Sequence, residues 1–152
     1  MCTADKPGRE HSSPAVRPRP GMERQATSIV ARTVGGRIID AVIRDLAYIG
    51  YLVEAKAPEG PYFEAAVIHH TDCGSRLLED PELRRGFAQR AGYDEQQLAA
   101  LPATVPAETV RSDVAKILAA PQVSTRITVS GHVYDTATSL LEAVAEPVGI
   151  AS

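Results

Sequence analysis

The sequence has little of what several classes of protein need. It contains two cysteines, no tryptophan and two phenylalanines among 152 residues. Two cysteines cannot build a disulfide framework, so we expect a reducing compartment, the cytoplasm. A net charge of −3 and few aromatic rings argue against a nucleic-acid partner, which usually meets a basic face or stacking rings. The sequence has no apolar run of about 18 residues and no apolar signal segment, so we expect no membrane partner.

The first 25 residues differ in composition from the rest. They hold four of the eleven prolines and five basic residues, and their apolar residues show no period. Such a segment buries too little apolar surface to offset the entropy lost on ordering. Three acidic residues accompany the basic ones, which favours a solvated tail over an arm that binds acidic partners. We therefore predict a flexible Pro/Arg-rich arm over residues 1–25 and a folded domain over residues 26–152.

Hydrophobic periodicity predicts strands and helices in the folded domain. The run 63–69 is apolar almost throughout, which is typical of a strand buried on both faces. Asp80 before Pro81, and Asp94, are typical of helix starts, and Gly35–Gly36 predicts a turn. The expected strands are 27–31, 63–69, 126–134 and 140–144, and the expected helices are 37–53, 80–92, 94–101 and 106–120. This order predicts an α/β fold: a three-layer sandwich with a central, mainly parallel β-sheet.

The segment His69–Gly74 carries the strongest chemical signal. His70 and Cys73 lie three positions apart, just past the apolar strand, where open α/β sheets place their sites. Imidazole and thiolate are ligands that zinc prefers, so the pair predicts half of a zinc site. The alternative is a buried cysteine beside a capping histidine. His69 should point to the opposite side of the strand, and we interpret it as structural.

Two other features of the sequence were weighed as part of this site. Arg32 and the Gly35–Gly36 turn could line it, although simple turn chemistry explains them equally well. His132 falls in a predicted strand, and we interpret it as a cross-strand or surface residue.

Four segments resemble, in the same order, motifs of the β-class carbonic anhydrases. Val67–Gly74 resembles the family's His-x-x-Cys-Gly zinc motif, and Arg32–Arg37 is similar to its Arg-Asn-Ala-Gly-Gly-Arg run. Val110–Ile117 resembles the family's helix ahead of the last strand, and Gly131–Asp135 is similar to its terminal Gly-x-x-Tyr-Asp hairpin. The matches span residues 27–145. The chain is identified as a divergent or N-terminally truncated member of that family.

The resemblance carries several expectations. It implies a β-carbonic anhydrase-like α/β fold, and zinc bound by Cys, His, Cys and a water, or by an aspartate in a closed form. It implies that His70 and Cys73 are the second and third zinc ligands. It implies the activity of a carbonate dehydratase, a lyase that hydrates carbon dioxide reversibly to bicarbonate. It also implies a homodimer or higher homo-oligomer, with the site near the subunit interface.

One motif of the family is missing. The resemblance implies a first zinc ligand from a Cys-x-Asp-x-Arg motif, whose aspartate and arginine orient the reacting water. The nearest segment is Cys2–Lys6, where the acid, Asp5, stands one place late and lysine replaces arginine. Lysine lacks the planar two-pronged donor of arginine. Cys2 is the candidate first ligand, Asp5 the candidate catalytic acid with Arg9 as its partner, and His11 a further candidate ligand.

Three functions follow from these observations. The first is a zinc-dependent carbonic anhydrase, impaired by the missing motif. The second is a non-catalytic relative that binds zinc or an anion, because a site with two ligands holds zinc poorly. The third is hydrolysis of a related small molecule such as carbon disulfide on the same scaffold. Zinc content per chain separates the first two, whereas the sequence does not separate the first from the third.

Overall fold

The computed structural model describes residues 28–59 and 63–150 of the chain. They belong to two compact units, Met1–Ala31 and Arg32–Ser152, and the predicted arm 1–25 lies outside the described residues. Residues 28–31 form no strand, so the predicted strand 27–31 is wrong over its described part. A β-prone run becomes a strand only where its backbone groups find a ladder partner, and these four residues have none among the described strands.

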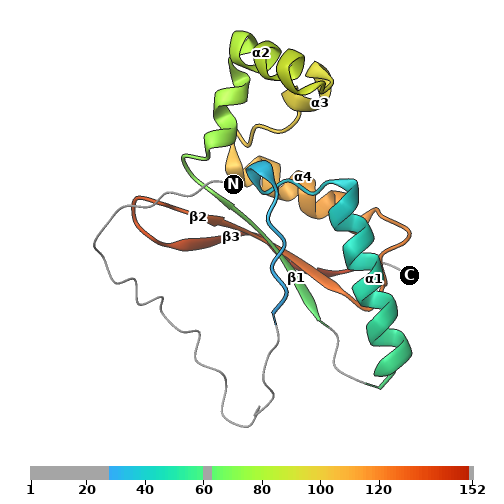
Figure 1. Cartoon of the computed structure of the whole chain (residues 1–152). Coiled ribbons are helices and arrows are strands. Elements are labelled where there is room, and N and C mark those ends of the chain that lie inside the picture. The colour runs from blue at the N-terminus through green and yellow to red at the C-terminus, as the bar shows by residue number, and fades with distance from the viewer. Residues whose placement is uncertain (1–27, 60–62, 151–152) are drawn as a thin grey trace. The chain divides into compact units, whose positions relative to one another are not determined.

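A three-stranded sheet organises the second unit (Figure 1). Its strands are β1 (Glu64–His70), β2 (Thr128–Tyr134) and β3 (Leu141–Gly149), in the order β1-β2-β3. β1 and β2 are parallel and in continuous register from Glu64↔Thr128 to His70↔Tyr134. β2 and β3 form an antiparallel pair with register shifts near Gly131. Because the two strands are parallel, the carboxyl ends of β1 and β2 lie at the same end of the sheet, and the candidate ligands follow β1 there.

Helices α1 (Asp40–Lys56) and α4 (Pro106–Leu118) contribute to the core that covers one face of this sheet. Val67 of β1 is 4% exposed on the covered face, whereas its neighbour Ile68 is 50% exposed on the other. This alternation follows from the two-residue period of a strand. The expected α/β class is confirmed, with one parallel and one antiparallel strand pair among the described strands. The buried core residues are Ile38, Ile43, Val67, Val110, Val114, Ile117, Val123, Ile127 and Val129.

A short helical segment separates β1 from α4. It consists of the 3₁₀ helix η2 (Gly74–Glu79), α2 (Pro81–Ala91) and α3 (Glu95–Ala99). The Asp80 side chain accepts hydrogen bonds from two backbone N–H groups of α2, and Gly92 ends that helix with φ 73°. The Asp94 side chain accepts from Gln97 N and starts α3. These starts agree with the sequence-based expectations, because caps are local features.

Other boundaries differ from the expected ones. Helix α1 begins at Asp40 rather than residue 37, because the 3₁₀ turn η1 (Val34–Gly36) leads into an extended segment that includes Arg37 and Ile39. The return strand β3 extends to Gly149 rather than residue 144. None of the helices that the structure describes combines the length and apolar character needed to cross a bilayer.

Candidate metal centre

His70 and Cys73 flank a tight turn at the end of β1. His70 is the last residue of the strand, and Cys73 is the N-cap of η2. Asp72 between them has φ 54°, in the left-handed region that non-glycine residues rarely adopt. A backbone held in this region at a turn between two candidate ligands requires support from its surroundings.

Threonine hydroxyls give that support. The Thr136 backbone N–H donates to Thr71 Oγ1 (3.0 Å), and Thr136 Oγ1 donates to Asp72 Oδ2 (3.2 Å). Since Thr136 gives its only hydroxyl proton to Asp72, the 3.0 Å contact between the two threonine hydroxyls is a donation from Thr71. The turn after β1 is therefore tied to the turn that joins β2 to β3.

The ring of His70 has one nitrogen free for a metal. Its Nδ1 lies 2.8 Å from the carbonyl oxygen of Thr71, which can only accept, so Nδ1 carries a proton. The neutral imidazole then presents the lone pair of Nε2.

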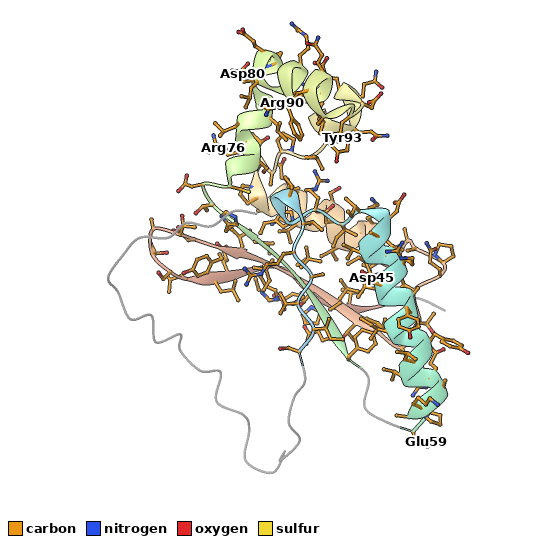
Figure 2. All side chains as sticks on the ribbon, in the orientation of Figure 1. Asp45, Glu59, Arg76, Asp80, Arg90 and Tyr93 are labelled. Atoms are coloured by element: carbon orange, nitrogen blue, oxygen red, sulfur yellow. The ribbon has the colours of Figure 1, made fainter. Side chains whose placement is uncertain are left out.

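Cys73 is 5% exposed and lines a pocket of about 490 Å³. Asp72, Gly74 and residues of η2, among them Arg76, complete the wall, and Figure 2 shows Arg76 on η2. The Ser75 hydroxyl lies 3.3 Å from Cys73 Sγ. The sulfur is thus shielded from bulk water and borders a shallow, open depression whose lining does not include His70.

A buried charge network lies beneath His70. Asp113 of α4 accepts from Arg37 Nε (2.9 Å) and Arg37 Nη2 (3.2 Å), and lies 3.3 Å from His69 Nε2. Arg37 also donates to the carbonyl of Ala100, and His69 Nε2 lies 3.1 Å from the carbonyl of Gly36. Both partners of His69 Nε2 are acceptors, so that nitrogen carries a proton. The network joins β1, η1, α4 and the end of α3, and it reaches β1 at His69, the neighbour of His70 in the chain.

Asp113 is ionised in this network. Burial raises the pKa of its carboxyl, but the hydrogen bonds from His69 and Arg37 and the Arg37 charge outweigh burial and hold the pKa below its ordinary value. The His69 Nδ1 is buried without a hydrogen-bond partner among the described residues. A buried polar atom of this kind calls for a water or a group from elsewhere in the chain.

The backbone at Gly36 packs so closely against the His69 ring that it leaves no room for a side chain. Gly36 has φ +70°, and a Cβ there would lie 2.8 Å from His69 Cδ2. We expect Gly36→Ala to displace the His69 ring and to destabilise the protein by about 1–3 kcal/mol. The urea midpoint measures this. Gly86→Ala is the control, since a Cβ there meets nothing within 4 Å. Equal midpoints for the two variants would contradict the tight fit.

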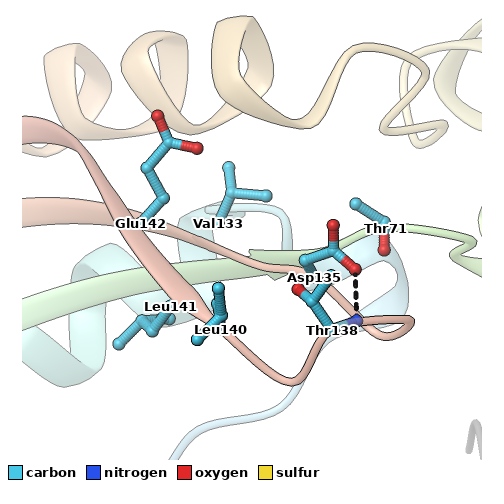
Figure 3. Close-up of a pocket in the computed structure, with 7 residues that line it drawn as sticks. All are labelled: Thr71, Val133, Asp135, Thr138, Leu140, Leu141 and Glu142. Atoms are coloured by element: carbon cyan, nitrogen blue, oxygen red, sulfur yellow. Dashed lines mark hydrogen bonds between the residues drawn. The ribbon is translucent and has the colours of Figure 1, made fainter.

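A second pocket, of about 540 Å³, lies beside the β2–β3 turn (Figure 3). Val133 and Glu142 face the same side of the hairpin, and Asp135 accepts hydrogen bonds from the backbone of Ala137 and Thr138. Those bonds lower the pKa of Asp135. The lining includes Thr71 but neither His70 nor Cys73, so this pocket is not the candidate centre.

The donor chemistry of the centre fits zinc in part. A His70 Nε2 lone pair and a Cys73 thiolate are two suitable donors. No group of three or more His, Cys, Asp or Glu side chains placed to hold a metal occurs within residues 28–59 and 63–150. The described part of the chain therefore presents two candidate ligands, and a closed site needs at least one more from elsewhere.

The other predicted site residues have varied positions. Cys2, Asp5, Arg9 and His11 lie outside the described residues. Arg32 is exposed. His132 lies in β2 opposite Ile68 and contacts Ser130 Oγ at 3.0 Å.

No family model matches the chain. The proteins named β-carbonic anhydrase 1 from Mycobacterium bovis and Mycobacterium tuberculosis are each 30% identical to it over 117 residues. The chain belongs to the β-carbonic anhydrase-like family. The alignment covers 76% of the chain, which spans 66% of the length of these curated relatives.

Solved structures agree with this β-carbonic anhydrase-like assignment. The crystal structure of carbonic anhydrase from Streptococcus mutans has a TM-score of 0.57 and 31% identity, over 73% of this chain and 63% of that one. An apo carbon disulfide hydrolase has a TM-score of 0.51 and 19% identity, over 72% of this chain and 62% of that one. The second likeness concerns the fold alone.

Sequence reasoning missed two groups near the centre, Ser75 and the Arg37–Asp113 pair. Asp113 could have been noticed in the sequence, because it lies three residues after Val110 and four before Ile117, on the inward face of the helix. A carboxylate on such a face requires partners. Ser75 left no signal, since serine is ordinary in a loop.

Proposed function

We propose that this protein is a zinc-dependent carbonic anhydrase, a carbonate dehydratase that interconverts carbon dioxide and bicarbonate. The observation that carries the proposal is the turn from His70 to Cys73 at the end of a parallel strand, in a chain 30% identical to two β-carbonic anhydrases. The proposed metal ligands are His70 and Cys73, with Cys2 as the further ligand and Asp5 as the candidate catalytic acid. We also propose a cytoplasmic location, with no nucleic-acid or membrane partner.

The protein's own residues prepare the site. His70 presents Nε2, because its Nδ1 proton is held by the Thr71 carbonyl. Thr136 fixes the turn between the two ligands, and the pocket beside Cys73 offers space for carbon dioxide or bicarbonate. When bound, zinc supplies a Lewis acid that makes water acidic enough to deprotonate near neutral pH.

We propose that the activity is impaired. The missing Cys-x-Asp-x-Arg motif removes the groups that orient the reacting water in the family, and loss of supporting groups typically costs about 10- to 100-fold. Stopped-flow carbon dioxide hydration is therefore expected to be at least about 10-fold slower per bound zinc than in the Mycobacterium tuberculosis relative. Equal rates would contradict the impairment.

A deletion decides whether Cys2 completes the site. If it does, removing residues 1–25 abolishes both zinc binding and hydration, whereas removal of a mere tail changes neither. Full activity without residues 1–25 would show that neither Cys2 nor Asp5 is needed.

A second candidate is a non-catalytic relative that binds zinc or an anion. It is favoured because the described residues hold no group of three or more side chains placed to bind a metal. A zinc content well below one per chain, together with no hydration, would support it over the enzyme.

We propose a homodimer or higher homo-oligomer. β1 pairs only with β2 among the described strands, and Ile68 (50%) and Leu141 (54%) are exposed. An open strand edge and exposed apolar side chains favour association. Sedimentation velocity at micromolar concentration should give at least a dimer, and a monomer alone would contradict the proposal.

A further inference from the structure

Ser75 is a buried hydroxyl in direct contact with a proposed ligand. Its residue is 4% exposed, and Cys73 is 5% exposed. The Ser75 Oγ lies 3.3 Å from Cys73 Sγ, which is a hydrogen-bond distance for a sulfur acceptor. The sulfur therefore has a polar neighbour of its own, close to the pocket that it lines.

The surroundings decide which atom donates. The backbone N–H of Ala103 donates to Ser75 Oγ at 3.4 Å. A hydroxyl has one proton and two lone pairs, so this bond uses a lone pair and leaves the proton for another partner. Cys73 Sγ is the acceptor that the described residues place in contact with it. The hydroxyl thus donates to the sulfur.

The hydroxyl is also held in place. A Cβ on Gly35 would lie 3.1 Å from Ser75 Oγ and 2.7 Å from the Leu101 carbonyl oxygen. The η1 turn and the segment after α3 therefore enclose Ser75 with little spare room. A donor fixed before the metal arrives needs no reorganisation when the sulfur gains negative charge, and hydrogen bonds to charged acceptors are the stronger kind.

We propose that Ser75 is a positioning residue for the metal, whose hydroxyl donates to Cys73 Sγ and orients the sulfur for coordination. The inference rests on the proposed zinc site and adds to it a residue outside the His-x-x-Cys spacing. Partners of metal ligands typically change metal affinity by about 10- to 100-fold when removed.

The test compares Ser75→Ala with Ser130→Ala in the full chain. Ser130 is 0% exposed and bonds to His132 instead of a proposed ligand, so the second variant removes an equally buried hydroxyl away from the centre. Chelator competition should give a zinc Kd about 10- to 100-fold weaker for Ser75→Ala and unchanged for Ser130→Ala. Thermal unfolding of both metal-free variants checks that they fold.

Cobalt(II) gives a readout that a loss of stability alone does not produce. At saturating cobalt, the sulfur-to-metal charge-transfer band should move to longer wavelength in Ser75→Ala, because the hydrogen bond lowers the energy of the sulfur electrons. If Ser75→Ala binds zinc as tightly as the wild type and its band is unshifted, the role of Ser75 is overturned while the proposed zinc site stands. Equal weakening by both variants would also overturn it. A wild-type protein that binds no zinc would overturn the proposed site as well.

Discussion

Cys73→Ser is expected to remove zinc from the purified protein and to abolish carbon dioxide hydration. Serine has nearly the same shape but offers a hydroxyl that stays protonated, where zinc needs a deprotonated donor. Among the described residues the proposed ligands are His70 and Cys73, so losing one leaves a single proposed ligand there. The loss of affinity should exceed the roughly 100-fold change that supporting groups produce. Elemental analysis of both proteins measures it.

A pair of histidine variants provides the matched control. His70→Ala should lose zinc as Cys73→Ser does, while His132→Ala should keep it, because His132 bonds to Ser130 within β2. Equal zinc in the wild type and Cys73→Ser would refute the assignment of Cys73. Loss of zinc in His132→Ala but not in His70→Ala would move the site to the other histidine.

The features that the sequence predicted well are encoded locally. Asp80 and Pro81 start α2 because the carboxylate accepts from the first N–H groups of the same helix. The His70–Cys73 site stays a prediction, and its spacing was visible because both residues lie within one short segment. β1 was visible as an apolar run, although the structure buries one face of it and leaves Ile68 half exposed on the other. Whether each face of β1 is covered depends on which other elements pack against the sheet, and the local apolar pattern does not encode this.

The features that the sequence did not predict depend on distant partners. α1 starts three residues late because Arg37 is held by Asp113 and the Ile38 carbonyl accepts from Lys116 Nζ at 2.7 Å. Both partners lie more than 70 positions away, so the helical period alone extends the helix too far. Ser75 also depends on a partner outside its own segment, because its hydroxyl accepts a hydrogen bond from the backbone N–H of Ala103, 28 positions away.

Asp113→Ala is expected to lower the free energy of unfolding by about 1–3 kcal/mol. The change removes the acceptor that the buried His69 shares with the Arg37 guanidinium, which is 21% exposed. The carbonyls of Gly36 and Ala100 remain as their other acceptors, so the cost is that of a lost hydrogen-bond partner, about 1–3 kcal/mol, and not that of an isolated buried charge. Asp45→Ala is the control, because Asp45 is 60% exposed and only 3.5 Å from its neighbour Arg44. An exposed pair of this kind contributes about 1 kcal/mol at most. Urea denaturation of both variants at pH 7 measures the difference.

The pH dependence separates the charge of Asp113 from its shape. Because its folded-state pKa is held below the ordinary value, the ionised carboxylate stabilises the protein above the unfolded pKa of about 3.9. This stability is lost as pH falls through the folded pKa. Asp113→Asn keeps the shape without the charge, so the wild type should exceed it in stability at pH 7, and the gap should shrink below about pH 4. A gap that stays constant with pH would show that Asp113 acts through packing, and the network beneath His70 would then owe nothing to its ion pair.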